Sequence, residues 1–370
     1  MSVYEAVTKR DESALYQLRS LYRRYGYSQY KMSKFEEYDL YVRNKSFLLS
    51  DHVITFTDTD GKLMALKPDV TLSIVKNSKE DTGVRKVYYN ENVYRVPGGE
   101  SSFREIMQMG LECIGNIDTY CIAEVLILAA KSLEKMSPDY VLDISHLGVV
   151  STLIDRMGVS EDARRQILQC VGEKNPHGID GVCRSFGVDE ACAAPLKRLI
   201  SADGNCKTML ALLAEMDCGE GAAELGAILA AVRGSVCEDR IRVDFSVVND
   251  MNYYNGVVFN GFINGIPTSI LSGGQYDNLM RKMGKKAGAI GFAVYLDLLD
   301  RLPESGEAYD TDVVVLYESE ADATVVCRLV NALTEDGNRV TVGKTIPERI
   351  RYKKLIRVNG EEVNVIETNA

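Results

Sequence analysis

Apolar residues recur at helical spacing near the start of the chain and alternate with polar residues after it. Leu15, Leu18 and Tyr22 lie three or four positions apart between Glu12 and Gly26. This spacing predicts an amphipathic helix that ends at the glycine. Short β-type runs follow at 54–57, 62–66, 84–89 and 108–114, and the D-T-D-G turn at 58–61 predicts a hairpin between the first two. A helix at 119–136 and a strand at 140–144 complete this part of the pattern.

The second half of the chain changes its pattern twice. Between roughly His146 and Glu238 it is helical and rich in alanine and leucine, as in A-A-E-L-G-A-I-L-A-A-V, which indicates an inserted helical subdomain. Strand patterning returns at 241–248, 256–263 and 268–271, and a helix is expected after Gly291. Past Pro303, the runs D-V-V-V-L-Y, A-T-V-V-C-R-L-V-N-A-L and R-V-T-V predict a small β-α-β unit.

These elements predict an α+β fold, in which helices flank an antiparallel sheet that a helical insertion interrupts. A chain of 370 residues is longer than one typical domain, so two or three structural units are expected. We divide it into a core in two parts, a helical insertion and a small C-terminal α/β region. The core parts are 1–145 and 239–302, the insertion is 146–238, and the C-terminal region is 303–370.

The composition of the chain argues against several classes of protein function. The net charge of −10 disfavours a dominant nucleic-acid-binding role, because such binding depends on lysine and arginine neutralising phosphates. Accordingly, the basic run R-I-R-Y-K-K-L-I-R at 349–357 is interpreted as a solvated strand or an interface edge. Nine cysteines without a C-x-x-C pair, beside three histidines, predict neither a disulfide framework nor a zinc site. With no secretory signal and no apolar run of 18 residues, we expect a cytoplasmic protein without membrane contact, metal or cofactor.

Polar residues stand at turn and strand positions in two segments of the first half. In L-K-P-D-V-T at 66–71, Asp69 and Thr71 together suit an ammonium group, which has three donors and no acceptor. They equally suit the start of a helix, where such side chains bind first-turn amides. In F-R-E-I-M-Q-M-G-L-E-C-I-G at 103–115, Gln108 and Glu112 are four apart and share one face of a strand, which lines a pocket or faces solvent.

Together with V-Y-Y-N-E-N-V-Y-R at 87–95 and V-D-F-S-V-V-N-D-M-N-Y-Y at 243–254, these segments resemble the histidyl branch of the class II aminoacyl-tRNA synthetases, over about residues 10–302. The resemblance implies a class II synthetase-like core. The segment 26–38 looks like the family's dimer-forming motif, which implies a homodimer through the core. The resemblance further implies L-histidine as ligand, with a binding set of Asp69, Thr71, Arg95, Gln108, Glu112, Tyr253 and Tyr254.

The chain departs from the synthetase pattern where that family carries phosphate-binding arginines. Asn249, Gln275 and Leu298 stand at three of those positions. Loss of one such cation typically costs ~2.7–4 kcal/mol of transition-state stabilisation, so three losses argue against adenylation. The loop at 96–102 also lacks the family's pattern for ATP and the tRNA acceptor end, which makes tRNA an unlikely ligand. No catalytic residue is expected.

A degenerate synthetase core that keeps its amino-acid pocket is similar to one paralogous family, the regulatory subunits of ATP phosphoribosyltransferase. The short region after Asp310 fits this family, because it is too short for a complete anticodon-binding domain. The resemblance implies a non-catalytic subunit that assembles with a short-form catalytic phosphoribosyltransferase for the first step of L-histidine biosynthesis and contributes to feedback by histidine. Two alternatives stay open: a free-standing histidine-sensing or RNA-binding adaptor, and an active histidyl-tRNA synthetase.

Overall fold

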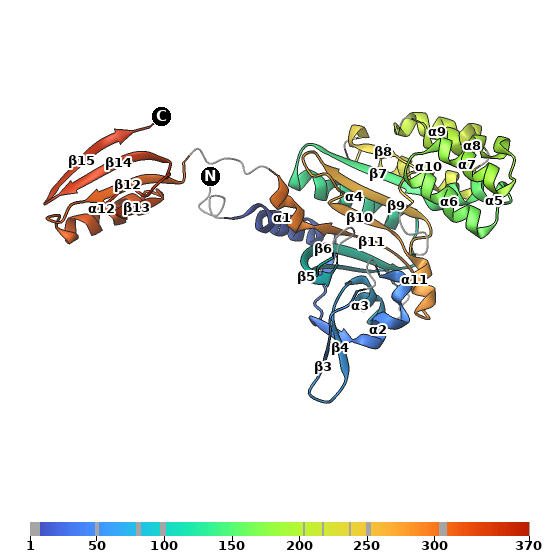
Figure 1. The fold of residues 1–370 in the computed structure, drawn as a ribbon, viewed down its shortest axis with the longest axis horizontal. Helices are drawn as coiled ribbons and strands as arrows, with labels where there is room; N and C mark the ends of the chain where they lie inside the picture. Colours follow the sequence, from blue (N-terminus) through green and yellow to red (C-terminus); the bar gives the residue numbers. More distant parts are fainter. Residues whose placement is uncertain are drawn as a thin grey trace. The chain divides into compact units, whose positions relative to one another are not determined.

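The computed structural model divides the chain into two compact units (Figure 1). The larger unit spans Lys9–Arg301, and the smaller one comprises Leu302–Ala370 and the first eight residues. The structure describes residues 8–48, 52–78, 83–96, 101–202, 204–216, 218–236, 238–248, 253–302 and 309–369.

A mixed eight-stranded sheet forms the centre of the larger unit. Its strand order is β1-β5-β6-β11-β10-β9-β7-β8, and the inner pairs from β5 to β7 are all antiparallel. Only the two edge strands, β1 and β8, run parallel to their neighbours. The strands are β1 (Ser28–Gln29), β5 (Arg85–Arg95), β6 (Arg104–Gly115), β7 (Tyr140–His146), β8 (Ile241–Val243), β9 (Val257–Ile263), β10 (Leu271–Gln275) and β11 (Gly288–Tyr295). The predicted α+β class is confirmed.

Helices α1 (Arg10–Arg24) and α4 (Thr119–Met136) cover one face of this sheet. The buried Tyr22 of α1 packs edge-on against Phe292 of β11, and its hydroxyl lies 2.9 Å from Ser132 Oγ of α4. Both helices were predicted from the sequence. The first ends where Gly26 takes the left-handed conformation (φ 84°), which lets Tyr27 N–H donate back to Tyr22 O. The helices leave the other face of the sheet for the site described below.

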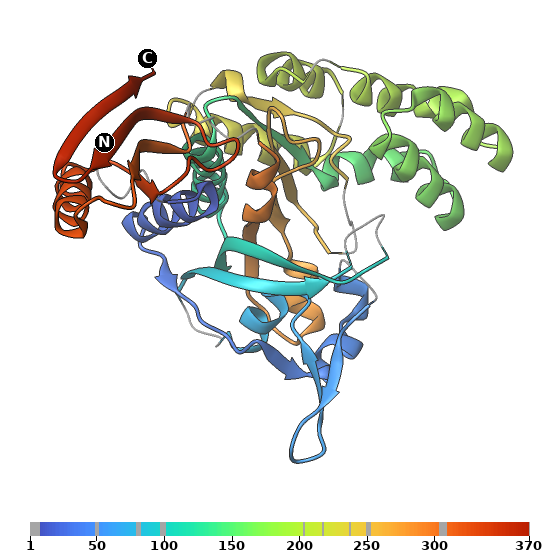
Figure 2. The ribbon, with the colours of Figure 1, turned by 60° about the vertical axis from the view of Figure 1, so that its left-hand side comes forward.

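A smaller three-stranded sheet, β2-β4-β3, joins the larger unit beside α2 (Tyr38–Arg43) and α3 (Thr71–Lys76). Its strands are β2 (Phe35–Glu37), β3 (Thr55–Thr57) and β4 (Leu63–Leu66). The hairpin predicted at 58–61 joins β3 to β4, with Gly61 at φ 85°, and projects from the unit in Figure 2. Ala65 is fully buried and anchors the inner face of this sheet on the core.

The alanine-rich stretch between β7 and β8 is helical, as predicted. Its helices gather at one end of the larger unit (Figure 1), and α10 also packs against α4. They are α5 (Leu147–Arg156), α6 (Glu161–Gly172), α7 (Pro176–Phe186), α8 (Ala194–Ile200), α9 (Cys206–Glu215) and α10 (Glu220–Val232). That this stretch is a separate domain stays a prediction.

The smaller unit contains the predicted β-α-β arrangement and two further strands. In its four-stranded sheet, of order β13-β12-β14-β15, β12 is parallel to both β13 and β14. Helix α12 packs on one face through Val325, Val326 and Leu329. The basic run is a strand, but it is not at the edge of the sheet, because most of it forms β14 between β12 and β15. The elements are β12 (Thr311–Tyr317), α12 (Ala323–Glu335), β13 (Val340–Gly343), β14 (Tyr352–Asn359) and β15 (Glu362–Thr368).

The helix predicted after Gly291 is wrong. Residues 288–295 form the central strand β11, and only a short 3-10 turn, Leu296–Arg301, follows it. A continuous apolar run fits a buried helix as well as a buried strand. β11 pairs with β6 on one side and β10 on the other, and its residues are buried or half-buried on both faces, so the strand shows no alternation of apolar and polar residues.

Candidate functional site

The face of the large sheet opposite α1 and α4 holds a cavity of about 250 Å³. It lies where β5, β6, β10 and β11 meet the start of α3 and the turn before β9. All seven residues that the sequence predicted as ligand-binding line this cavity. The lining residues are Phe47, Asp69, Thr71, Tyr89, Arg95, Gln108, Glu112, Tyr253, Tyr254, Ser269, Ser272, Tyr276, Gly291, Phe292, Ala293 and Tyr295.

Glu112 lines the cavity and has only 2% of its surface exposed. Two hydroxyl groups donate to its carboxyl group: Thr71 Oγ1 to Oε1 at 2.9 Å, and Tyr276 OH to Oε2 at 2.6 Å. Burial raises the pKa of Glu112 to about 8, although both hydrogen bonds act in the opposite direction. This pKa favours the protonated carboxyl group at neutral pH.

Glycine makes the room for this carboxyl group. Gly291 of β11 lies opposite Glu112 of β6 in the antiparallel register. A Cβ atom at position 291 would lie 1.7 Å from Glu112 Oε2 and 2.4 Å from Leu111 O. Neither the backbone nor the tightly bound carboxyl group can move that far, so position 291 requires glycine.

The structure shows where the polar residues with open alternatives lie, and for Asp69 it is compatible with both. Asp69 does cap α3, because its Oδ1 accepts the Leu72 N–H at 2.8 Å, and it also lines the cavity. Burial raises the pKa of the Asp69 carboxyl, and the nearby charge of Arg95 opposes this shift. The solvent-facing interpretation of Gln108 and Glu112 is wrong, since they are only 4% and 2% exposed.

Arg95 places a buried positive charge at the cavity. It ends β5, is 7% exposed, and its guanidinium lies 5.7 Å from the centre of the Tyr295 ring. Within the described ranges, no acidic side chain forms an ion pair with Arg95. A guanidinium in this position is suited to bind a carboxylate or phosphate of a ligand.

Aromatic rings form another wall. Tyr253 lies at the centre, with ring centres 4.7 Å from Tyr254, 5.8 Å from Tyr276 and 5.9 Å from Phe47. Burial raises the pKa of Tyr253 and Tyr276 well above the ordinary value, so both hydroxyls stay neutral. Such a wall accommodates a flat ring whose edge meets the Glu112 carboxyl.

Sequence reasoning missed nine of the sixteen described residues that line the cavity, among them Phe47, Tyr89 and Tyr276. Tyr276 stands in the segment S-G-G-Q-Y-D at 272–277, next to a position that was considered for its missing arginine. Its hydroxyl had no signal of its own, because the predicted strand ended at Leu271 and the contact with Glu112 joins residues far apart in the sequence. Phe47 and Tyr89 had no signal either, because Phe47 comes from a short 3-10 helix and Tyr89 from the middle of β5.

The positions that lack the synthetase arginines were predicted to supply no cation. The structure describes two of them: Gln275 ends β10 and Leu298 lies in the turn after β11. Asn249 lies outside the described residues, as do residues 97–100 of the altered loop. Among described residues, no group of histidine, cysteine and acidic side chains suits a metal ion, and no helix is long and apolar enough to span a membrane.

The cavity thus combines the buried carboxyl group of Glu112, the half-buried one of Asp69, an amide, an aromatic wall and a guanidinium that has no ion-pair partner in the part of the chain that the structure describes. Carboxyl groups and hydroxyls accept hydrogen bonds from an ammonium group, and a guanidinium binds a carboxylate. The aromatic wall and Glu112 suit a planar ring that carries a polar nitrogen. The arrangement therefore fits a small zwitterion with a flat, polar side chain.

Comparison with known proteins gives a consistent picture. The model of the histidyl-tRNA synthetase family matches residues 2–299. A relative in Caldanaerobacter subterraneus subsp. tengcongensis, named ATP phosphoribosyltransferase regulatory subunit, is 27% identical and covers 87% of each chain. The solved structure of an ATP phosphoribosyltransferase regulatory subunit/histidyl-tRNA synthetase from Bacillus halodurans has a TM-score of 0.73 at 22% identity, covering 95% of this chain and 94% of that one.

A chain in the ATP phosphoribosyl transferase (HisG:HisZ) complex from Thermotoga maritima has a TM-score of 0.61 at 19% identity. It covers 77% of this chain and 97% of its own length. At these identities the solved structures show the fold alone, and they confirm the predicted class II synthetase-like core.

The raised pKa of Glu112 predicts a pH dependence of stability. The folded chain keeps this proton up to about pH 8, whereas an unfolded glutamate loses it near pH 4.5. Between these values the folded state binds more protons, so its stability falls as pH rises. In Glu112→Gln this contribution is absent. We expect the free energy of unfolding of the variant, relative to wild type, to rise by ~2–4 kcal/mol between pH 5 and pH 9.

Urea unfolding of both proteins across this pH range measures the difference. Comparison with the variant cancels the titration of all other groups. Parallel pH profiles of the two proteins would show that Glu112 titrates normally and would contradict the account of its burial.

Proposed function

This chain belongs to the histidyl-tRNA synthetase family, and we propose that within it the chain is a non-catalytic regulatory subunit of an ATP phosphoribosyltransferase. It acts in the cytoplasm in the first step of L-histidine biosynthesis. The observation that carries the proposal is that all seven residues expected to bind an amino acid line one cavity, whereas Gln275 and Leu298 supply no cation. Relatives named regulatory subunits of this transferase, similar over most of their length, support it.

The pocket supports L-histidine as the ligand through its distribution of polar groups. We assign the ammonium group to Asp69 and Thr71 and the carboxylate to Arg95. Gln108 and Glu112 receive the imidazole nitrogens, and Tyr253 and Tyr254 cover the ring. Tyr276, which holds Glu112, joins this set. Each charged or polar part of histidine then has a partner of matching chemistry, as burial requires.

The same geometry argues against adenylation by this chain. Gln275 and Leu298 supply no positive charge where a nucleotide triphosphate needs several, and the sequence has asparagine at 249. The guanidinium of Arg95 alone lines the cavity among the described arginines. A single cation can hold the carboxylate of an amino acid, but it cannot also stabilise the charge that develops on a reacting phosphate.

The subunit's partner is a separate, short-form catalytic phosphoribosyltransferase. The Thermotoga maritima structure supports this, because its similar chain is part of a transferase complex. Histidine regulates the complex if it binds the active and less active states of the complex with different affinity. Typical coupling energies of 1–3 kcal/mol correspond to roughly 5- to 150-fold changes.

The chain also forms a homodimer through its core. The outer face of the β2-β4-β3 sheet supports this, because the strand register places Phe35, Phe56, Met64 and Leu66 on one side. Phe35 and Phe56 are 42% and 37% exposed and meet edge to face at 5.4 Å. Exposed apolar faces of this kind mark contacts between chains, and two-fold dimers are the commonest assembly.

Histidine binding gives the most specific test of the pocket. Replacement of Gln108 or of Glu112 by Ala should weaken binding of L-histidine by roughly 5- to 150-fold, because a buried imidazole nitrogen loses its partner. Titration calorimetry measures this affinity. Glu105→Ala, on the same strand but at the surface, is the matched control and should bind like wild type. Unchanged affinity in both pocket variants would contradict the assignment of Gln108 and Glu112 to histidine binding.

The missing cations predict that the purified chain performs no histidine-dependent exchange of pyrophosphate into ATP. Introduction of arginine at Leu298 alone should not restore exchange, because Gln275 and Asn249 still supply no charge. Radiolabelled pyrophosphate measures the reaction against a no-protein control. Exchange above that control would show that the chain is an active synthetase.

Assembly with the catalytic subunit tests the regulatory role. Mixing the two purified proteins should give a hetero-oligomer by light scattering and a higher rate of phosphoribosyl transfer, which histidine lowers. A Tyr254→Ala chain should assemble and activate but respond less to histidine, because the pocket loses one ring. A mixture with neither complex nor activation contradicts the regulatory proposal. A mutant complex inhibited like wild type shows that histidine acts elsewhere.

A further inference from the structure

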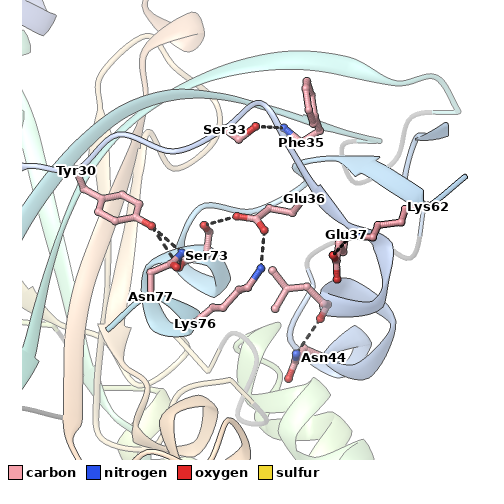
Figure 3. Close-up of polar contacts among 11 residues, drawn as sticks. Tyr30, Ser33, Phe35, Glu36, Glu37, Asn44, Lys62, Ser73, Lys76 and Asn77 are labelled. Atoms are coloured by element: carbon pink, nitrogen blue, oxygen red, sulfur yellow. Dashed lines mark hydrogen bonds and ion pairs between the residues drawn. The ribbon is translucent and has the colours of Figure 1, made fainter. Parts of the chain in front are cut away.

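Glu36 and Glu37 are neighbours on β2, yet their side chains point to opposite faces of the small sheet. Glu37 points outward, where it lies 3.5 Å from Lys62 Nζ. Glu36 points inward, toward α3 (Figure 3). Its Oε1 accepts a hydrogen bond from Ser73 Oγ at 3.0 Å, and its Oε2 binds Lys76 Nζ at 2.8 Å. One carboxylate thus binds two side chains of one short helix.

The two contacts lie on one side of α3. Ser73 and Lys76 are three residues apart, so they are neighbours on one face of the helix. Tyr30 adds to the same side, because its hydroxyl donates to Ser73 O at 3.4 Å and accepts from Asn77 Nδ2 at 3.1 Å (Figure 3). This face is held by polar contacts from β2 and from the segment before it.

The ligand site lies on the opposite side of α3. At about 100° per residue, Thr71 is rotated about 160° from Ser73 around the helix axis. Thr71 Oγ1 donates to Glu112 at 2.9 Å, inside the cavity. The helix therefore lies between two carboxyl groups. Glu36 binds the side of α3 that faces β2, and Glu112 binds the side that faces the cavity.

The contact between Glu36 and Ser73 affects the position of α3 because Ser73 is buried. Its exposed fraction is 0%, and Glu36 is the acceptor of its hydroxyl. Removal of the acceptor leaves a buried donor unsatisfied, so the helix must shift or admit water. A helix of only six residues has little intrinsic stability to resist that shift.

We propose that Glu36 is a positioning residue of the ligand site, which holds α3 so that the Thr71 hydroxyl meets Glu112. Glu36 touches no ligand and acts through the helix. The consequence for histidine binding rests on the proposed function, whereas the consequence for Glu112 does not. Because Glu36 belongs to the sheet whose outer face is exposed, this contact also connects that face to the cavity.

The test compares Glu36→Ala with Glu37→Ala. We expect Glu36→Ala to weaken L-histidine binding by roughly 5- to 30-fold in calorimetry, the effect of one lost buried hydrogen bond. Glu37→Ala should stay within about twofold of wild type, because its exposed ion pair contributes little. Glu36→Gln should lie between the two, since its amide oxygen still accepts from Ser73 but its amide cannot pair with Lys76. This variant also keeps the test valid if Glu36→Ala folds poorly.

A double-mutant cycle separates positioning from general destabilisation. In a Thr71→Val background, Glu36→Ala should weaken histidine binding by less than about twofold further, because the hydroxyl that Glu36 positions is absent. An equal loss in both backgrounds would show that Glu36 only stabilises the fold, and no loss in either would remove its role altogether.

A readout without ligand keeps this inference separate from the proposed function. In the wild type, the Thr71 hydroxyl lowers the pKa of Glu112. Carbon NMR of the glutamate carboxyl groups should therefore show the Glu112 titration at higher pH in Glu36→Ala and unchanged in Glu37→Ala. If wild type binds no histidine but this shift occurs, the assigned ligand is wrong and the positioning role holds. An unshifted Glu112 titration would overturn the positioning role.

Discussion

The buried carboxyl group of Glu112 is the constraint on which the site depends. Placing a carboxyl group in the middle of a sheet is costly unless it is hydrogen-bonded, and two hydroxyls from separate elements meet it here. The neighbouring strand must be glycine at 291 to leave space. The site further requires that α3 be held at a fixed position, so that its Thr71 hydroxyl meets Glu112. These conditions tie β6, β10, β11 and α3 into one arrangement.

Much of the fold could be predicted from local sequence patterns, because residues at the ends of several helices and strands mark where these elements begin or end. Residues 119–136 form α4 as predicted, and its start follows from Asp118, whose carboxylate accepts the Cys121 N–H. The β3–β4 hairpin follows from glycine in its turn. The wrong helix after Gly291 and the central position of β14 have a common cause. The order of strands in a sheet, and the burial of a strand on both faces, depend on pairing between segments that are distant in the sequence. A single apolar or basic run does not determine that pairing.

The candidate site was predicted from a family resemblance more than from physical pattern. The structure brings Asp69, Thr71, Arg95, Gln108, Glu112, Tyr253 and Tyr254 to one cavity. Spacing alone placed Gln108 and Glu112 on one face without deciding between pocket and solvent. The hydroxyl of Tyr276 and the inward direction of Glu36 could not be predicted, because each depends on contacts with residues far away in the sequence.

We propose that the cavity recognises the whole of L-histidine, including its carboxylate. Titration calorimetry with L-histidine and with histamine, which lacks the carboxylate, tests it most directly. The account predicts that histidine binds at least about tenfold more tightly than histamine, because Arg95 loses a charge-assisted hydrogen bond with the smaller ligand. The same comparison in Arg95→Ala should show little preference. Absence of histidine binding, or equal binding of both ligands to the wild type, would contradict the account.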